Sequence, residues 1–438
     1  MPYLFNLFYM ALIVVASPWL LYQVVRRGKY RAGLAEKFLG RVPVRQGNRP
    51  CLWLHAVSVG EVNLLAPLLA EIRRTRPDWE CVISATSVTG YTLARKKYAD
   101  YTVCYCPLDF SWAVRAAMRR IRPDCLVLAE LELWPNLIRA AREAASAVAI
   151  INGRLSEHSF RGYQRARLFL RPLVEKIDLV AVQNEEFAAR FRALGARDEA
   201  VRITGSIKFD GAQTSRANPA TVALAKAAGF ATDDIVFLAG STQQPEEALA
   251  LTAYKSLRDR FPRLRLVLVP RHPERFEEVA ALLAASEIPW QRRSKLNADG
   301  VDPQARVLMV DTVGELGAWW GTAHIAFVGG SIHKRGGQNM IEPAAYGAAV
   351  SFGPNTRNFR DIVAQLLAAK GAVVVRDGAE MTAFVERCLV DSSFASNLGS
   401  NARGLVARQL GATARTLAGI DRLMDRPQGE SSRARSAA

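Results

Sequence analysis

Short apolar runs alternate with amphipathic segments along almost all of this 438-residue chain, and this alternation limits its fold more than any other feature. Seven runs in the first half are typical of strands: 52–57, 81–85, 101–106, 125–129, 148–152, 179–183 and 201–204. Helix-type segments such as 61–74 and 113–121 separate them. Strands that alternate with helices predict βαβ units and a parallel sheet.

A polar stretch, residues 205–222, interrupts this pattern, which then starts again. Six further strand-like runs follow: 235–239, 264–269, 307–310, 325–328, 349–352 and 372–375. A chain of this length suits two domains better than one. We therefore predict two doubly wound α/β domains, 26–212 and 213–425, and a disordered tail at 426–438.

The N-terminal residues 2–25 contain no formally charged side chain, and a basic cluster from Arg26 to Arg31 follows them. This length is about enough for a helix to cross a bilayer. No basic residue precedes the apolar run, so a cleaved signal peptide fits poorly, and the basic flank predicts that the following domains stay in the cytoplasm. We predict a membrane-anchor helix over residues 1–25. Because of Pro18, a helix that lies in the interface is the alternative.

The net charge of +17 indicates an anionic partner, such as nucleic acid, an acidic lipid surface or a phosphorylated substrate. The chain lacks zinc-finger spacing and an RNP1-like motif, which argues against nucleic acid. Six scattered cysteines without a C-x-x-C motif predict buried, reduced thiols. Neither H-E-x-x-H nor D-x-D occurs, so no metal is implied.

A glycine-rich loop after the strand at 325–328 predicts an anion-binding site in the second domain. Gly329 and Gly330 would let backbone amides approach a ligand, and a helix start follows near Asn339. The Asn339–Glu342 pair is also a variant of the capping box, so capping and ligand contact both stay open. Gly240-Ser241-Thr242 is a second glycine-to-helix anion site. The P-loop motif is absent.

Polar residues that could carry chemistry follow several predicted strands. Glu61 begins a helix after the first strand, where it could accept a proton or serve only as a first-turn acid. Glu130 and Glu132 end another strand, and Lys208 lies at the domain junction, where it could meet negative charge or be a solvated linker residue. Arg271 at a strand end suits bidentate binding of a phosphate or carboxylate.

Nine motifs closely resemble the family of 3-deoxy-D-manno-octulosonic acid (Kdo) transferases, which add Kdo to a lipid A precursor. In chain order they are LHAVSVGE, LAELELWPN, NGRLS, AVQNEEFAARFRALGA, TGSIKFD, LVPRHPERF, DTVGEL, AFVGGS and GGQNMIEP. The resemblance covers nearly the whole chain. It implies a GT-B glycosyltransferase, in which an anchored acceptor-binding domain and a CMP-Kdo-binding domain face a cleft. It also implies a site at the cytoplasmic face of the bacterial inner membrane.

The family pattern implies that Glu61 is the general base and that Glu130 and Lys208 act at the transition state. It implies that CMP is held by Pro270, Arg271, Val313, Gly314, Glu315, Asn339, Met340, Ile341 and Glu342. The expected reaction inverts the sugar and needs no metal or other cofactor. Two alternatives are a GT-B transferase that uses a UDP-sugar, and a membrane-tethered nucleotide-binding protein without turnover.

Overall fold

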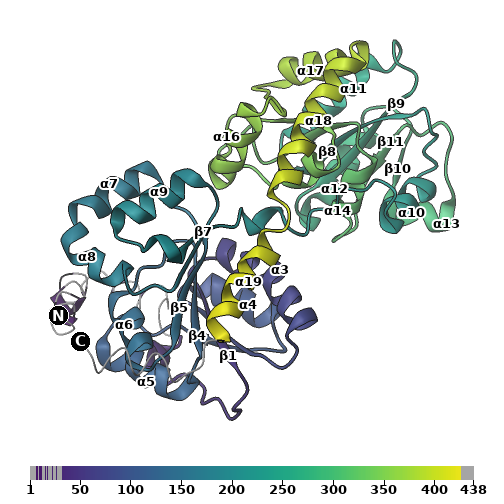
Figure 1. Cartoon of the computed structure of the whole chain (residues 1–438). Coiled ribbons are helices and arrows are strands. Elements are labelled where there is room, and N and C mark those ends of the chain that lie inside the picture. The colour runs from purple at the N-terminus through teal and green to yellow at the C-terminus, as the bar shows by residue number, and fades with distance from the viewer. Residues whose placement is uncertain are drawn as a thin grey trace. The chain divides into compact units, whose positions relative to one another are not determined.

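The computed structural model describes residues 6, 7, 9–11, 15, 17, 22, 26 and 32–425 (Figure 1). The chain divides into two compact units. The first comprises the described residues up to Asp210 and those from Leu410 onward, and the second comprises Gly211–Gln409. The boundary after Asp210 lies inside the predicted linker at 205–222.

The first unit is built on a seven-stranded parallel sheet in the order β3-β2-β1-β4-β5-β6-β7. The strands are β1 (Cys51–Ala56), β2 (Glu80–Ala85), β3 (Thr102–Tyr105), β4 (Cys125–Ala129), β5 (Ala147–Gly153), β6 (Leu179–Val182) and β7 (Val201–Ile203). All seven predicted strands of this half are confirmed to within one residue at each end. The order reverses between β1 and β4, which places the carboxyl ends of these two strands side by side at the topological switch point.

Helices cover both faces of this sheet, so the side chains of successive strand residues are buried in two different hydrophobic cores, one on each face. Trp53 of β1 packs with α5 (Ser111–Ile121) and α6 (Pro135–Glu143), whereas Leu54 packs with α3 (Val59–Thr75) and α4 (Val88–Lys97). The helices of this part are α2 (Leu34–Leu39), α3 (Val59–Thr75), α4 (Val88–Lys97), α5 (Ser111–Ile121), α6 (Pro135–Glu143), α7 (Glu157–Arg165), α8 (Arg167–Val174) and α9 (Glu185–Leu194). The continuous burial of β1 explains why its sequence is an apolar run and not an alternating one.

The last helix, α19 (Ala412–Met424), belongs to the first unit, which corrects the predicted second domain of 213–425. Its apolar face, including Leu417 and Ile420, is buried in the core that also holds Leu54. The Asp210 carboxylate accepts hydrogen bonds from the backbone N–H groups of Gly411 (2.7 Å) and Thr413 (2.5 Å) and so caps the helix start. The second unit therefore ends at Gln409.

The second unit has its own seven-stranded parallel sheet, in the order β10-β11-β9-β8-β12-β13-β14. The strands are β8 (Ile235–Thr242), β9 (Leu264–Pro270), β10 (Trp290–Arg292), β11 (Val307–Met309), β12 (Ile325–Val328), β13 (Ala349–Phe352) and β14 (Ala372–Val374). All six predicted strands are confirmed. The edge strand β10 was not predicted, because only Trp290 among its three residues is apolar.

The main helices of the second unit are α10 (Pro219–Ala227), α11 (Glu246–Leu257), α12 (Phe276–Ala284), α14 (Leu316–Trp319), α15 (Ile341–Ala345), α16 (Arg360–Ala368), α17 (Gly378–Val390) and α18 (Ser392–Gln409). Phe237, Leu266 and Phe327 from neighbouring strands form one buried core with α11 and α17. The two units together give the predicted pair of doubly wound α/β domains. The cleft predicted between them stays a prediction.

The predicted anchor at residues 1–25 and the predicted tail at 426–438 lie largely or wholly outside the described residues. Within the described part of the chain, no helix combines the length and the apolar character needed to cross a membrane. All six cysteines are described; they are buried and form no disulfide, as predicted.

Candidate active site

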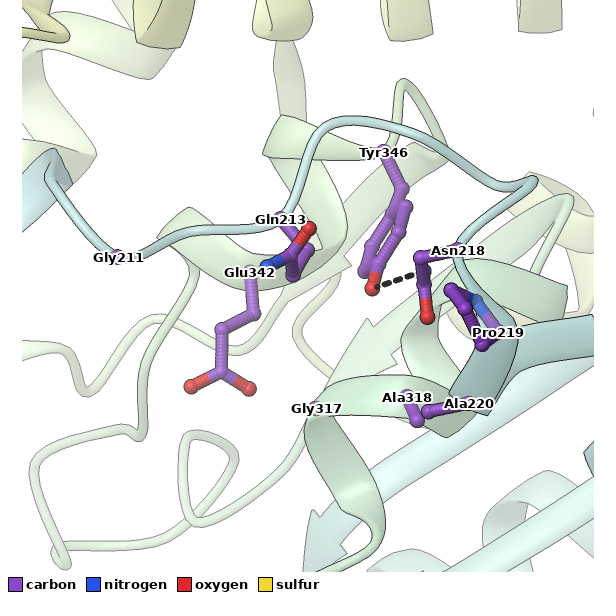
Figure 2. Close-up of a pocket in the computed structure, with 9 residues that line it drawn as sticks. All are labelled: Gly211, Gln213, Asn218, Pro219, Ala220, Gly317, Ala318, Glu342 and Tyr346. Carbon is purple, nitrogen blue, oxygen red and sulfur yellow. Dashed lines mark hydrogen bonds between the residues drawn. The ribbon is translucent and has the colours of Figure 1, made fainter.

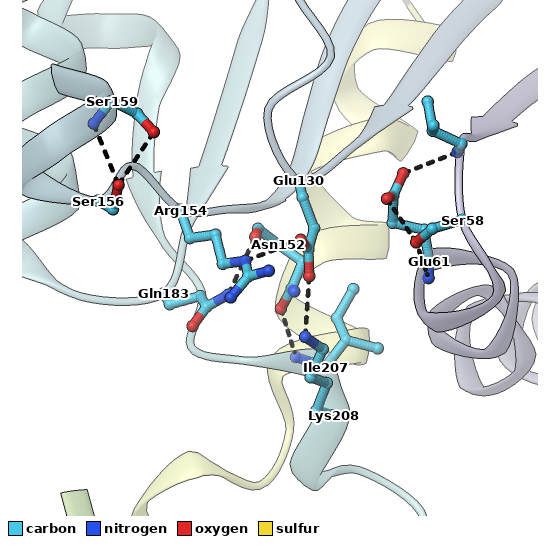
Figure 3. A network of polar contacts seen from close by, with 11 residues as sticks. Ser58, Glu61, Glu130, Asn152, Arg154, Ser156, Ser159, Gln183, Ile207 and Lys208 are labelled. Atoms are coloured by element: carbon cyan, nitrogen blue, oxygen red, sulfur yellow. Dashed lines mark hydrogen bonds and ion pairs between the residues drawn. The ribbon is translucent and has the colours of Figure 1, made fainter. Parts of the chain in front are cut away.

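Glu61 lies in the first turn of α3, beyond the carboxyl end of β1, and its side chain is only 8% exposed (Figure 3). One carboxylate oxygen accepts a hydrogen bond from the Val57 backbone N–H (2.8 Å), and the other accepts one from the Ser58 hydroxyl (2.8 Å). Ser58 caps the same helix by accepting from the Glu61 backbone N–H. Glu61 thus occupies the first-turn position that was the alternative to a catalytic role, and it also takes part in capping the helix; these roles and the role of a base fit one residue.

The pKa of Glu61 is raised, and burial is the largest cause. The hydrogen bonds from Val57 and Ser58 favour the ionised form and lower the pKa, whereas the nearby charge of Glu130 raises it. A helix N-terminus alone would have made this carboxylate a weak base. Burial offsets that effect and makes Glu61 better suited to take up a proton.

Glu130 follows β4 directly and adopts the left-handed conformation, with φ of 58°. One of its carboxylate oxygens pairs with the Lys208 ammonium group (2.9 Å), and the other pairs with Arg154 Nε (2.7 Å; Figure 3). Lys208 is therefore held in an ion pair, although its side chain is 32% exposed. Two of the three predicted catalytic residues touch each other, and the third, Glu61, lies within electrostatic range of Glu130.

Asn152 and Arg154, at the end of β5, were not predicted as site residues. Asn152 is fully buried with φ of 53°, and its side-chain oxygen accepts a hydrogen bond from the Ile207 backbone N–H (3.1 Å). This bond fixes the short helical turn Ile207–Phe209, which carries Lys208. The polar triplet Asn152-Gly153-Arg154 directly after an apolar strand was the signal that could have identified both residues.

Glu132, which the sequence analysis placed with Glu130 at the end of a strand but outside the predicted catalytic residues, forms part of the acidic cluster. One carboxylate oxygen accepts a hydrogen bond from Trp134 Nε1 (2.8 Å). Burial, together with the charges of Glu61 and Glu130, raises the pKa of Glu132 to about 7, although the Trp134 bond lowers it. Glu132 is therefore a second carboxyl group of the site whose pKa is raised.

We expect Glu132→Gln to make the protein more stable than wild type at pH 8. The pKa of Glu132 is about 7 when folded and roughly 4.3 when unfolded. Between these values the folded state binds a proton that the unfolded chain lacks, so stability falls as the pH rises from about 4 to 7. The glutamine variant does not titrate and lacks this loss. Because Glu132 is only half-buried, solvent screens part of the effect, and we expect the free energy of unfolding at pH 8 to rise by about 1–2 kcal/mol.

Urea unfolding at pH 5 and pH 8 measures this difference. Glu143→Gln is the control, because the pKa of Glu143 is lowered, chiefly by its hydrogen bond with Arg115. This variant should be slightly less stable than wild type at pH 8. An equal pH dependence in wild type and Glu132→Gln would contradict the raised pKa.

A pocket of about 430 Å³ in the second unit lies beside part of the predicted CMP site (Figure 2). Its lining residues are Gly211, Gln213, Asn218, Pro219, Ala220, Gly317, Ala318, Glu342 and Tyr346. This volume lies in the range of small-molecule sites. Among the predicted CMP contacts, Glu342 is the one that lines the pocket. Met340 and Ile341 are buried, at 0% and 3% exposure.

Asn339 and Glu342 contact each other as well as the helix start. Asn339 Nδ2 donates to the Glu342 carboxylate (2.9 Å), and Asn339 Oδ1 accepts from the Ile341 backbone N–H (3.1 Å). Burial raises the pKa of Glu342, and the charge of Arg271 lowers it, so Arg271 lies near this carboxylate. The structure brings the ends of β9 and the start of α15 together, as the prediction of one binding site requires.

Val313, Gly314 and Glu315 precede α14, whose Gly317 and Ala318 line the same pocket. Val313 is 77% exposed, and Gly314 has φ of 96°, a conformation that favours glycine. The Glu315 carboxylate accepts hydrogen bonds from Nε and Nη2 of Arg293 (3.1 Å each), from the Thr312 hydroxyl and from Trp319 Nε1. With these bonds, the Glu315 side chain stabilises the loop that precedes α14.

The glycine-rich loop after β12 does bind an anion, but the anion is the protein's own Glu246. One Glu246 oxygen accepts from the Gly330 N–H (2.7 Å), and the other accepts from the Ser331 (2.9 Å) and Ile332 (3.0 Å) N–H groups. The first oxygen also accepts from the Gln243 N–H (3.0 Å). A Cβ atom on Gly329 would meet this carboxylate at 2.7 Å. The amides of this loop are therefore occupied by an internal carboxylate, and the residue that supplies it follows the second predicted segment, Gly240-Ser241-Thr242.

Within the described residues, no group of three or more histidine, cysteine, aspartate or glutamate side chains has an arrangement that could hold a metal ion. The expectation that the reaction needs no metal stays a prediction.

Comparison with known proteins gives a consistent family assignment. The family model for 3-deoxy-D-manno-octulosonic-acid transferase (kdotransferase) matches residues 29–211. The 3-deoxy-D-manno-octulosonic acid transferase of Haemophilus influenzae is 31% identical over 94% of this chain and 97% of its own length. The enzyme of the same name from Bordetella pertussis is 33% identical over 84% of this chain and 86% of its own length.

A solved structure supports the fold independently of sequence. The UDP-GlcNAc 2-epimerase from Neisseria meningitidis, solved with UDP-GlcNAc, aligns with a TM-score of 0.54 over 85% of this chain and 100% of its own. At 12% identity this likeness shows the fold alone, a GT-B-like pair of parallel-sheet α/β domains.

Proposed function

Because this chain belongs to the 3-deoxy-D-manno-octulosonic acid (Kdo) transferase family and is thus a glycosyltransferase, we propose that it moves Kdo from CMP-Kdo to a lipid A precursor, lipid IVA. The observation that carries the proposal is the buried carboxylate of Glu61, with its raised pKa, beside the Glu130–Lys208 ion pair. This cluster lies at the switch point of the first sheet, where open α/β sheets bind their ligands.

In the proposed reaction, Glu61 takes the proton from a hydroxyl group of the acceptor. The hydroxyl oxygen forms a bond to the anomeric carbon of Kdo, and the bond from that carbon to the phosphate oxygen of CMP breaks. The electron pair leaves with CMP. Attack on the face opposite the departing phosphate inverts the configuration, as in inverting glycosidases with separated carboxyl groups.

The positive groups of the site suit the anionic substrates. Lys208 and Arg154 both pair with Glu130, and we propose that these two cationic groups attract the carboxylate of Kdo or a phosphate of the acceptor. In the second unit, Arg271 and the backbone groups around Asn339–Glu342 are proposed to hold CMP. Charge on the leaving phosphate can be stabilised by such donors, and therefore we propose a reaction without metal.

We also propose that the protein acts at the cytoplasmic face of a bacterial inner membrane. The net charge of +17 favours an anionic lipid surface, and the apolar residues 2–25 are suited to membrane attachment. The acceptor is itself a lipid, so the enzyme and its substrate would meet at this surface.

Incubation of the full chain with CMP-Kdo and lipid IVA, followed by mass spectrometry of the lipid, tests the proposal. We expect the lipid mass to increase by one or more Kdo units, and equal product with and without EDTA. Competition by CMP but not by UDP would distinguish the reaction from that of a UDP-sugar transferase. The absence of a Kdo-bearing lipid after incubation with CMP-Kdo would reject Kdo transfer to this acceptor.

A further inference from the structure

Four polar side chains are buried together at the starts of α5 and α6, and one comes from the far N-terminus of the chain. Asn6, Asp109, Ser111 and Asn136 are 6%, 3%, 7% and 3% exposed. Asn6 Nδ2 donates to the Ser111 hydroxyl (2.8 Å), and Asn6 Oδ1 accepts from the Ser111 backbone N–H (3.0 Å) and from Asn136 Nδ2 (3.3 Å). Both ends of the Asn6 amide are therefore matched, as a buried polar group requires.

Asp109 completes this cluster and caps α6 from a different loop. Its carboxylate accepts from the backbone N–H groups of Asn136 (3.0 Å) and Leu137 (2.8 Å). Its backbone carbonyl accepts from Asn136 Nδ2 (2.6 Å). The Tyr9 hydroxyl donates to the same carboxylate (3.1 Å), and the Tyr9 ring packs edge-on against Phe110. Two N-terminal residues thus contact the groups that fix the first turn of α6.

This first turn is the end of the segment that carries the acidic residues of the site. Glu130 leaves β4 in the left-handed conformation, and residues 131–134 form no regular structure before α6 begins at Pro135. Trp134, at the helix start, holds the Glu132 carboxylate. The segment 130–136 is therefore fixed at one end by the sheet and at the other by Asp109 and Asn6.

Resting on the proposed function, we propose that Asn6 is a positioning residue that holds segment 130–136 in its productive conformation. The N-terminal segment would then be part of the catalytic domain and not only an attachment to a membrane. Asn6 does not touch a substrate. It acts through Asn136 and Trp134 on the placement of Glu132 and Glu130, which lie beside Glu61.

Three variants of the full chain in detergent test this inference: Asn6→Ala, Tyr9→Phe and Leu7→Ala. Asn6→Ala removes the three side-chain bonds of Asn6, and Tyr9→Phe removes the hydroxyl bond to Asp109. Leu7 is 62% exposed and serves as the matched neighbour. Steady-state transfer from CMP-Kdo gives kcat and the donor KM. Hydrogen exchange reports on the amides of residues 130–137 and on the rest of the chain.

We expect Asn6→Ala to lower kcat roughly ten- to hundredfold with an unchanged donor KM, because small misplacements near reacting groups have effects of this size. Exchange should rise at residues 134–137 and not throughout the first unit. Tyr9→Phe should act in the same direction by a few fold, and Leu7→Ala should resemble wild type.

Wild-type kcat in Asn6→Ala, or unchanged exchange at residues 134–137, would overturn the inference. If Asn6→Ala does not fold, Tyr9→Phe decides: unchanged kcat and unchanged exchange at Asn136 and Leu137 would reject it. Absence of transfer by the wild type would count against the proposed function. In that case hydrogen exchange alone would test the role of Asn6: increased exchange at residues 134–137 would support it, and unchanged exchange would reject it.

Discussion

Glu61→Gln should abolish Kdo transfer while the binding of CMP-Kdo is unaffected. A positioned general base accounts for roughly 10²- to 10⁴-fold of a reaction rate, and glutamine cannot take up the proton. The substitution should not disturb the fold. The amide oxygen can accept the Val57 N–H bond, and the amide nitrogen can donate to the Ser58 hydroxyl, which also caps α3. A loss of transfer activity would therefore reflect the missing proton acceptor and not a change in the fold.

Transfer rates and CMP-Kdo affinity for Glu61→Gln and for Glu71→Gln measure this effect. Glu71 lies on the same helix and pairs with Arg74, whose side chain is 71% exposed, so its variant should retain full activity. In the wild type, kcat should rise as the pH rises through the raised pKa of Glu61, since the base must be ionised. Wild-type turnover by Glu61→Gln would remove this residue from the base role.

The sheets could be predicted from the sequence because parallel strands buried on both faces are continuous apolar runs. The C-terminal helix could not be assigned to its domain in this way. The apolar face of α19 fits either core in principle, and the choice of the first unit depends on contacts such as Asp210 with Gly411. A helix pattern shows that a face is buried but not which surface covers it.

The acidic cluster was predicted only in part, and the difference follows from the sheet order. Glu61 and Glu130 were identified through a family resemblance, and the neighbouring positions of β1 and β4 explain why they lie near each other. Arg154 was not identified, because its pairing with Glu130 depends on β5 lying beside β4. The raised pKa of Glu132 depends on burial by residues distant in sequence, which no local pattern reveals.

The glycine-rich loop after β12 was correctly predicted to bind an anion, but the anion is a side chain of the protein and not a ligand. The sequence predicted exposed amides that bind an anion, and these amides do bind a carboxylate. The partner, Glu246, starts α11 after β8, which is the sheet neighbour of β12. A residue 84 positions away therefore occupies the place that the local pattern assigned to a ligand.

Glu246→Ala should strongly destabilise the second unit. The Glu246 side chain is 1% exposed and accepts from four backbone N–H groups, of Gln243, Gly330, Ser331 and Ile332. Each buried donor left without an acceptor costs roughly 1–3 kcal/mol. Water can enter part of the vacated space, so we expect a total loss of about 3–5 kcal/mol, or roughly 10 °C in the melting temperature.

Thermal unfolding of the full chain, together with hydrogen exchange at residues 330–332, measures the loss. Glu277→Ala is the control, because the Glu277 side chain is 81% exposed in its pair with Arg292, and its melting temperature should stay close to that of the wild type. Added acetate should raise the melting temperature of Glu246→Ala and not that of the wild type, since the vacated site fits a carboxylate. A melting temperature equal to that of Glu277→Ala would show that the four N–H groups find other acceptors, and that Glu246 does not hold the loop.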